Sequence, residues 1–198
     1  MKSEDSQLEV LIACHSPRRA LARAVGSVLE DNPENTAVTV VGHNVSVDVL
    51  VGSLPEELAG GVRWLSLDDG VRSPANPYNF GASQVRSPWM AFLGSDDYLQ
   101  PGAVSEWQKL SAGSDAVVTR LVHDDGKSVR TPPIRPFFRG RRDAVKDRLY
   151  YRSAPLGALR TAFVRDHDLR WDQGLGSGGD LRFSTELWTQ GRVAVQSS

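Results

Sequence analysis

Two adjacent carboxylates, Asp96 and Asp97, are the side chains of this sequence whose type and position most clearly suggest chemistry. They follow an apolar run at 90–93 and precede a Pro-Gly pair at 101–102. A short apolar run bounded by turn residues is typical of a buried strand, so the carboxylates are expected where a strand leaves a sheet. Ligands of open α/β sheets bind at the carboxyl ends of the strands, and paired carboxylates there suit a Mg²⁺ or Mn²⁺ ion that in turn holds a diphosphate. The same residues also suit a helix N-terminus, where aspartate caps the helix and complements its dipole.

The segments before this acidic pair alternate between strand and helix patterns. Apolar and β-branched runs predict strands at 8–14, 37–41 and 62–67. Helical patterns separate them, the first starting near Ser16 and Pro17 and the second spanning 45–54. This alternation favours right-handed crossovers and a parallel sheet. The later expected elements are helices at 78–86 and 103–110, strands at 89–93 and 115–122, a strand or turn at 154–162, a helix after Asp180 and a strand at 192–195.

Composition narrows the class of protein. The 198 residues suit one domain, and an apolar content of 40% is enough to build a core. A net charge of −1 gives no global electrostatic case for nucleic acid or an anionic membrane. The polar start MKSEDSQ is not a signal peptide, and no apolar run is long enough for a membrane span. The single cysteine excludes an internal disulfide and a multi-cysteine zinc site, and it fits the reducing cytoplasm, which is the expected location.

Basic residues and prolines are concentrated in the segment 130–152. Two interpretations stay open for this segment. It is either a solvated loop or a cationic flap over phosphate groups, since arginine forks match phosphate oxygens. A nucleic-acid platform is a third possibility, but the near-neutral total charge argues against it, so no nucleic-acid partner is expected.

Two ungapped blocks carry a resemblance to a known family. In 10–29 the pattern R-A-x-x-S-V-L begins at Arg23, and 79–97 contains N-x-G, an aromatic-apolar strand and the acidic pair. A looser third block is GGDLRFSTELWTQG at 178–191. Together they resemble the inverting family-2 glycosyltransferases of the GT-A fold over most of the chain. The resemblance implies an α/β, Rossmann-like single domain over 1–198, with a mixed, mostly parallel sheet flanked by helices. It also implies a nucleotide-sugar-binding half at 1–100 and an acceptor and catalytic-base half at 101–198.

The resemblance also assigns roles to residues. It implies transfer of a sugar, with inversion, from a nucleotide-diphosphate donor to an acceptor hydroxyl. The expected donor is a UDP-sugar, and the acceptor is a glycan, a protein or a lipid. Asp180 falls on the catalytic base, a role worth roughly 10²–10⁴-fold in rate, although locally it also fits a helix N-cap after glycines. Asp96 and Asp97 fall on the ligands of Mn²⁺ or Mg²⁺. The positions implied to bind the nucleotide sugar are Ala13, His15, His43, Asn44, Arg72, Asn79, Ser95 and Asp96.

The sequence departs from the family's pattern at several of these positions. Gly94 stands where the family has an aspartate, yet two carboxylates suffice because Mg²⁺ is commonly held by one or two of them plus substrate phosphates. Gly42 and His43 replace the aspartates that recognise the base, although His43 or Asn44 can still form hydrogen bonds with a base edge. Further replacements affect a proline, a tyrosine, an arginine and a glutamate of the family, which are Ala13, His15, Tyr78 and Gly179 here.

These departures keep two other functions open. One is a non-catalytic nucleotide-sugar-binding protein, or a degenerate transferase that works with a partner. The other is a nucleotidyltransferase, which would release pyrophosphate from a nucleoside triphosphate. The latter ranks last, because no glycine-rich, basic triphosphate loop follows the first expected strand.

Overall fold

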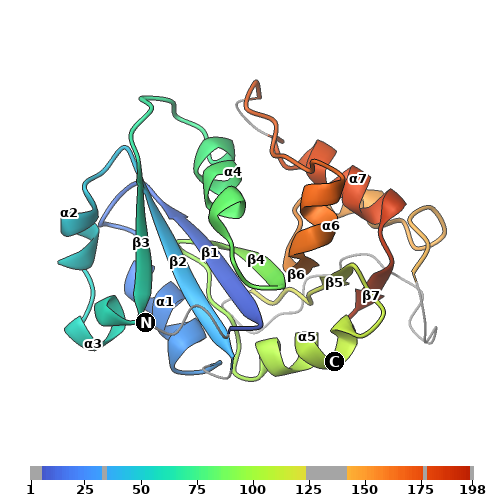
Figure 1. The fold of residues 1–198 in the computed structure, drawn as a ribbon, viewed down its shortest axis with the longest axis horizontal. Helices are drawn as coiled ribbons and strands as arrows, with labels where there is room; N and C mark the ends of the chain where they lie inside the picture. The colour runs from blue at the N-terminus through green and yellow to red at the C-terminus, as the bar shows by residue number, and fades with distance from the viewer. Residues whose placement is uncertain (1–5, 33–34, 124–141, 176–177, 197–198) are drawn as a thin grey trace.

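The structure is a computed structural model that describes residues 6–32, 35–123, 142–175 and 178–196. The strands of this part form one sheet in the order β3-β2-β1-β4-β6-β5-β7 (Figure 1). The strands β3, β2, β1 and β4 are parallel, whereas β6 is antiparallel to both β4 and β5. The predicted mixed, mostly parallel sheet of a single domain is therefore confirmed. The strand bounds are β1 Leu8–Cys14, β2 Thr36–His43, β3 Val62–Leu67, β4 Trp89–Gly94, β5 Ala116–Val118, β6 Gly157–Arg160 and β7 Val193–Val195.

Helices cover both faces of the sheet because the strands alternate their apolar side chains between two cores. Val10 and Ile12 of β1 belong to a core that includes residues of α1, α3 and α5. Leu11 between them faces a second core, which includes residues of α4, α6 and α7. Figure 1 shows α4 and α5 on opposite sides of the sheet. The helix bounds are α1 Leu21–Leu29, α2 Val47–Val51, α3 Glu56–Gly60, α4 Ala75–Gln84, α5 Ala103–Ser111, α6 Thr161–Asp166 and α7 Leu181–Gln190, with a short 3-10 helix η1 at Leu149–Tyr151.

The register of the central strands brings their carboxyl ends to one edge. Cys14 pairs with Gly42 of β2, and Ala13 pairs with Gly94 of β4. The chain segments that leave β1, β2 and β4 therefore begin side by side. This edge is where the sequence placed the acidic pair.

Several element boundaries differ from the predicted ones. The helix α1 begins at Leu21, because Ser16 organises a turn instead of capping a helix: its hydroxyl accepts the N–H of Arg18 at 3.2 Å, and its carbonyl accepts that of Arg19 at 3.3 Å. The strand β5 has three residues, so the strand predicted over 115–122 was too long. The short helices α3 and α6 were not predicted at all.

The start of α4 also differs from its prediction. This helix begins at Ala75 and runs through Pro77, whereas the sequence predicted a start at Tyr78. Proline is tolerated in the first turn of a helix because the N–H that it lacks would have no intrahelical partner there.

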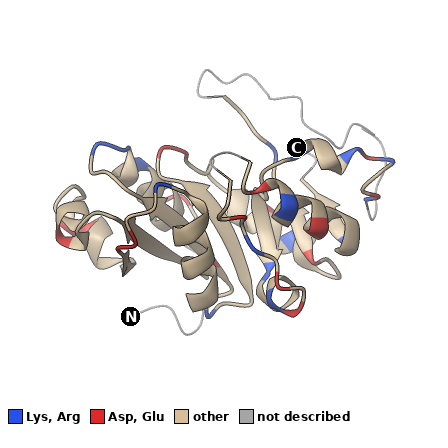
Figure 2. Ribbon diagram, turned by 90° about the horizontal axis from the view of Figure 1, so that it is seen from above, with Lys and Arg blue, Asp and Glu red and all other residues tan. Residues whose placement is uncertain are grey.

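Acidic and basic residues are interspersed along the ribbon of the chain (Figure 2). Within the described residues, no helix combines the length and apolarity needed to cross a membrane. The part of the basic segment at 130–141 lies outside the described residues, so the cationic flap stays a prediction. The cytoplasmic location and the division into halves at 1–100 and 101–198 also stay predictions.

Candidate functional site

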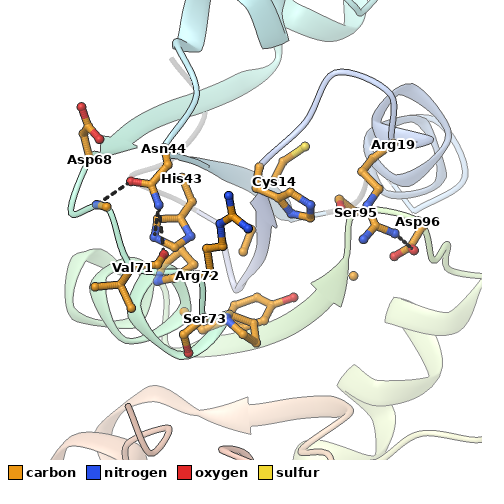
Figure 3. Close-up of a pocket in the computed structure, with 17 residues that line it drawn as sticks. Cys14, Arg19, His43, Asn44, Asp68, Val71, Arg72, Ser73, Ser95 and Asp96 are labelled. Carbon is orange, nitrogen blue, oxygen red and sulfur yellow. Dashed lines mark hydrogen bonds and ion pairs between the residues drawn. The ribbon is translucent and has the colours of Figure 1, made fainter. Parts of the chain in front are cut away.

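A cavity of about 850 Å³ opens at the carboxyl ends of the central strands (Figure 3). Its volume lies in the range of sites that bind small molecules and cofactors. Of the residues predicted to bind a nucleotide sugar, all but Asn79 line it. The lining comprises Ala13, Cys14, His15, Arg19, His43, Asn44, Asp68, Gly70, Val71, Arg72, Ser73, Pro74, Pro77, Tyr78, Gly94, Ser95 and Asp96.

Asn44 shapes one end of the cavity by holding the loop that follows β3. Its side-chain nitrogen donates to the carbonyl oxygen of Val71 at 3.0 Å. Its side-chain oxygen accepts the backbone N–H groups of Asp69 at 3.1 Å and Gly70 at 2.9 Å. The backbone of Asn44 has a φ of 55° in the left-handed region, which asparagine tolerates better than most residues. Both ends of the Asn44 amide are therefore used within the protein, so its contribution at this end is to fix the loop.

His43 lies beside Asn44 and is buried. Its Nε2 atom is 2.9 Å from Oδ1 of Asp69, whose other carboxylate oxygen accepts the side-chain N–H of Asn76 at 2.6 Å. The pKa of Asp69 is lowered, first by the hydrogen bond from Asn76 and then by those from His43 and the backbone of Val71. Because an ionised carboxylate only accepts hydrogen bonds, Nε2 of His43 is the donor in this contact. Asp69 was not among the predicted site residues, because its partner His43 is 26 positions away in the chain.

The other end of the cavity carries opposite charges in contact. Arg19 forms an ion pair with Asp96, through Nη1 and Oδ2, beside Ser95 (Figure 3). Arg72 points toward the middle of the cavity in the same view. Arg19 was not among the predicted site residues, although two consecutive arginines a few residues after the carboxyl end of β1 were a usable signal. The guanidinium groups of Arg19 and Arg72 thus line the same cavity, and such groups suit phosphate.

The acidic pair turns back over Gly94. A Cβ atom on Gly94 would lie 2.5 Å from Oδ2 of Asp97 and 3.3 Å from Oδ1 of Asp96, so one oxygen of each carboxylate approaches the same point. The pKa of Asp97 is raised, first by burial and then by the charge of Asp96. Only Asp96 of the two lines the cavity.

This pair of carboxylates fits a hard divalent cation as a partial ligand set. Carboxylate oxygens are the ligands that Mg²⁺ and Mn²⁺ prefer. Among the described residues, no group of three His, Cys, Asp or Glu side chains is arranged to hold a metal ion. A cation at Asp96 and Asp97 would therefore complete its coordination with phosphate oxygens or water.

Asp180 lies outside the cavity lining, directly before α7. It occupies the N-cap position of this helix, but its side chain makes no capping hydrogen bond. The residue is half-buried, and the local interpretation as the N-cap of a helix is confirmed in position, without the hydrogen bond that a capping side chain would make. Its role as a catalytic base stays a prediction.

A bracket of contacts ties the segment before Asp180 to the rest of the site. The side chain of Asn79 in α4 makes two hydrogen bonds with the backbone of Trp171, donating to its carbonyl at 2.9 Å and accepting its N–H at 2.8 Å. The ring of Trp171 stacks on Tyr78, whose hydroxyl donates to the carbonyl of Leu93 at 3.0 Å. The next residue, Asp172, donates its backbone N–H to Gly179 at 2.7 Å. These contacts connect the end of β4 with the residue that precedes Asp180.

Comparisons with known proteins agree with this architecture. The chain is 28% identical over 211 residues to the succinoglycan biosynthesis protein ExoO of Rhizobium meliloti (strain 1021), covering 95% of this chain and 58% of that protein. Crystal structures of S. aureus TarS 1–349, in complex with UDP and with UDP-GlcNAc, match with TM-scores of 0.78 and 0.81 at 19% identity. These matches cover 97% of this chain and 58% and 56% of those chains, so this chain spans little more than half the length of these relatives. The likeness to TarS confirms the predicted fold.

The family follows from a broader match. The family model described as "Glycosyl transferase family 2" matches residues 9–168, which is most of the chain. The resemblance inferred from the sequence blocks is thereby confirmed: the chain belongs to glycosyl transferase family 2.

Proposed function

We propose that this protein transfers a sugar from a UDP-sugar to an acceptor hydroxyl with inversion of configuration. The observation that carries the proposal is the cavity at the carboxyl edge, which has the polar side chains His43 and Asn44 at one end, Arg19 and Asp96 at the other, and Arg72 pointing toward the middle. A nucleotide diphosphate has the same division into a neutral base and a charged tail. Family membership and the UDP-bound structures of TarS support the same donor class.

In this proposal the acceptor oxygen forms a bond with the anomeric carbon on the face opposite the bond that breaks. The electron pair of the breaking bond leaves with the nucleoside diphosphate. Asp180 takes the proton of the acceptor hydroxyl. Asp180 lies outside the cavity, on a segment that hydrogen bonds between Asn79 and Trp171 connect to α4. This position supports an acceptor-binding region that is separate from the donor-binding cavity.

Asp96 and Asp97 would hold a Mn²⁺ or Mg²⁺ ion in this proposal. Such an ion neutralises the diphosphate and stabilises it as a leaving group. Arg72 supplies a further positive charge from the opposite wall of the cavity. His43 presents its imidazole edge to the base, in the orientation set by Asp69.

Donor hydrolysis and transfer, each followed as UDP release with and without EDTA, test the proposal. UDP-GlcNAc is the first donor probe, since a related fold binds it. We expect metal-dependent UDP release that is lost in Asp96→Ala. Asp180→Asn should lower transfer by roughly 10²-fold or more while UDP binding is retained. Unchanged release in Asp96→Ala would contradict the metal site, and unchanged transfer in Asp180→Asn would contradict the base.

A thermal-shift screen of UDP, GDP, CDP and ADP with Mn²⁺ identifies the base. A ligand at 100 times its Kd stabilises the folded state by about 2.7 kcal/mol, which corresponds to a rise in Tm of about 5–10 °C for a chain of this length. We expect the largest rise with UDP. An equal or larger rise with another nucleotide would contradict the UDP assignment.

A non-catalytic nucleotide-sugar-binding protein is the second candidate. The observation that favours it is the ion pair of Arg19 with Asp96, which occupies a carboxylate that the transferase needs. This candidate predicts the thermal shift with UDP but no release of UDP from any UDP-sugar, with or without an acceptor.

A further inference from the structure

The ion pair of Arg19 with Asp96 joins two groups that the proposed reaction needs separately. A cation site requires the carboxylate of Asp96, and a diphosphate site requires guanidinium groups such as that of Arg19. Both side chains line the same cavity and they contact each other (Figure 3). The resemblance to the family gave no role to Arg19.

We infer that Arg19 is an exchangeable counter-ion of the site. It neutralises Asp96 while the cavity holds no ligand, and it turns to the diphosphate when Asp96 takes the divalent cation. This inference rests on the proposed function and adds a diphosphate-binding residue to it.

The backbone around Arg19 is held by hydrogen bonds while its side chain is partly exposed, as such an exchange requires. The thiol of Cys14 donates to the carbonyl of Ser16 at 3.3 Å, and the same carbonyl accepts the N–H of Arg19 at 3.3 Å. The hydroxyl of Ser16 accepts the N–H of Arg18. In contrast, the side chains of the ion pair are 41% exposed for Arg19 and 55% exposed for Asp96. The guanidinium can therefore leave Asp96 without a change in the fold.

Positive charge faces the neighbouring carboxylates Asp96 and Asp97 in both states of this exchange. Without ligand, Arg19 offsets one of their two negative charges. With ligand, a divalent cation offsets the same two carboxylates, and the released guanidinium faces oxygens of the diphosphate, whose geometry it matches. Arg72 approaches the same space from the loop after β3.

The exchange predicts opposite effects of one substitution on two ligands. In Arg19→Gln, the cation no longer competes with a guanidinium, so Mn²⁺ alone should bind more tightly. Exposed ion pairs contribute little, which limits this gain to about fivefold or less. UDP should bind at least about tenfold more weakly in the presence of Mn²⁺, because a charge-assisted hydrogen bond to phosphate is lost.

Two titrations measure these effects on the whole chain. Electron paramagnetic resonance of free Mn²⁺ gives the Kd of the metal alone, and calorimetry gives the Kd of UDP at saturating Mn²⁺. Arg18→Gln is the matched control, since Arg18 is the adjacent, exposed arginine and does not line the cavity. It should leave both constants within about twofold. Arg19→Lys retains the charge but not the fork, so it should keep the Mn²⁺ affinity near that of the wild type and still weaken UDP binding.

The outcomes separate this inference from the proposed function. If Arg19→Gln shifts both ligands in the same direction, or leaves either unchanged, the exchange is wrong while metal-dependent transfer can stand. Asp96→Asn should abolish Mn²⁺ binding in the same titration. If the wild type binds no Mn²⁺ even with UDP present, or if Asp96→Asn keeps its Mn²⁺ affinity, both the exchange and the proposed metal site are overturned.

Discussion

The role of Asn79 is where the family resemblance and the structure make different predictions. The resemblance places Asn79 among the residues that bind the nucleotide sugar. The structure places its side chain outside the cavity, with both amide atoms bonded to the backbone of Trp171. Asn79→Ala removes these two hydrogen bonds and leaves the N–H and C=O of Trp171 without them.

The size of the effect follows from these two bonds. Each lost hydrogen bond costs about 0.5–1.5 kcal/mol, and more where a buried backbone group is left unpaired. Because both bonds are part-buried, we expect the free energy of unfolding to fall by about 2 kcal/mol. For a chain of this length that lowers Tm by about 4–8 °C.

Three measurements test this role. Thermal unfolding gives the Tm, calorimetry gives the Kd of UDP with Mn²⁺, and hydrogen exchange reports on the backbone at 169–175. We expect faster exchange there, a UDP affinity within about twofold of the wild type, and slower sugar transfer because the segment before Asp180 loosens. Ser83→Ala is the control on the same helix, since the Ser83 hydroxyl donates to the carbonyl of Phe80 and accepts a side-chain N–H of Gln84, both within α4.

A particular combination of results would refute the reasoning. An unchanged Tm together with UDP binding weakened tenfold or more would mean that Asn79 contacts the donor. The hydrogen bonds between Asn79 of α4 and Trp171 would then not stabilise the fold. The donor-binding role that the family resemblance implies for Asn79 would be supported instead.

Two further predictions concern the stability of the fold. Gly157 has a φ of +127°, and a Cβ atom there would overlap the carbonyl oxygen of Val117. We therefore expect Gly157→Ala to lower the free energy of unfolding, measured in urea, by about 3 kcal/mol or more. Gly60→Ala, with open space around it, should be neutral or slightly stabilising, and equal effects of the two substitutions would contradict this account. Asp115 accepts two side-chain hydrogen bonds from Arg192, at 2.9 and 3.0 Å, and the first of the causes that lower its pKa is this side-chain bonding. Its stabilisation is thus present above the ordinary pKa of 3.8 and lost as the pH falls through the lowered one. Asp115→Asn should lower the free energy of unfolding by about 2 kcal/mol at pH 7, a figure reduced because Arg192 is partly exposed. The loss should become smaller toward pH 2. An equal loss at both pH values would contradict the ion pair.

The sequence predicted those parts of the fold that depend on local patterns. The strand at 62–67 has the bounds that its apolar run indicated, and the acidic pair follows β4 at the carboxyl edge as its flanking turn residues implied. These predictions succeeded because a buried parallel strand needs a short apolar run and little else. The donor-binding candidates came from the family resemblance, and most of them line one cavity because adjacent parallel strands end at the same edge.

The features that the sequence did not predict depend on contacts between distant residues. Ser16 has the residue type of a helix cap, but it serves the turn that carries Arg19. The position of β6 between β4 and β5 is set by strand pairing across long separations. The contacts of Arg19 with Asp96 and of His43 with Asp69 span 77 and 26 positions, and no local pattern reports such pairs.

The crowding at Gly94 couples this position to Asp97. The family resemblance implies an aspartate at position 94, but a Cβ atom there would lie 2.5 Å from Oδ2 of Asp97, at the far end of that side chain. Any residue other than glycine at 94 therefore requires Asp97 to take another rotamer, which would move one of the two candidate metal ligands. Mutant libraries of the acidic motif are best built with 94 and 97 varied together.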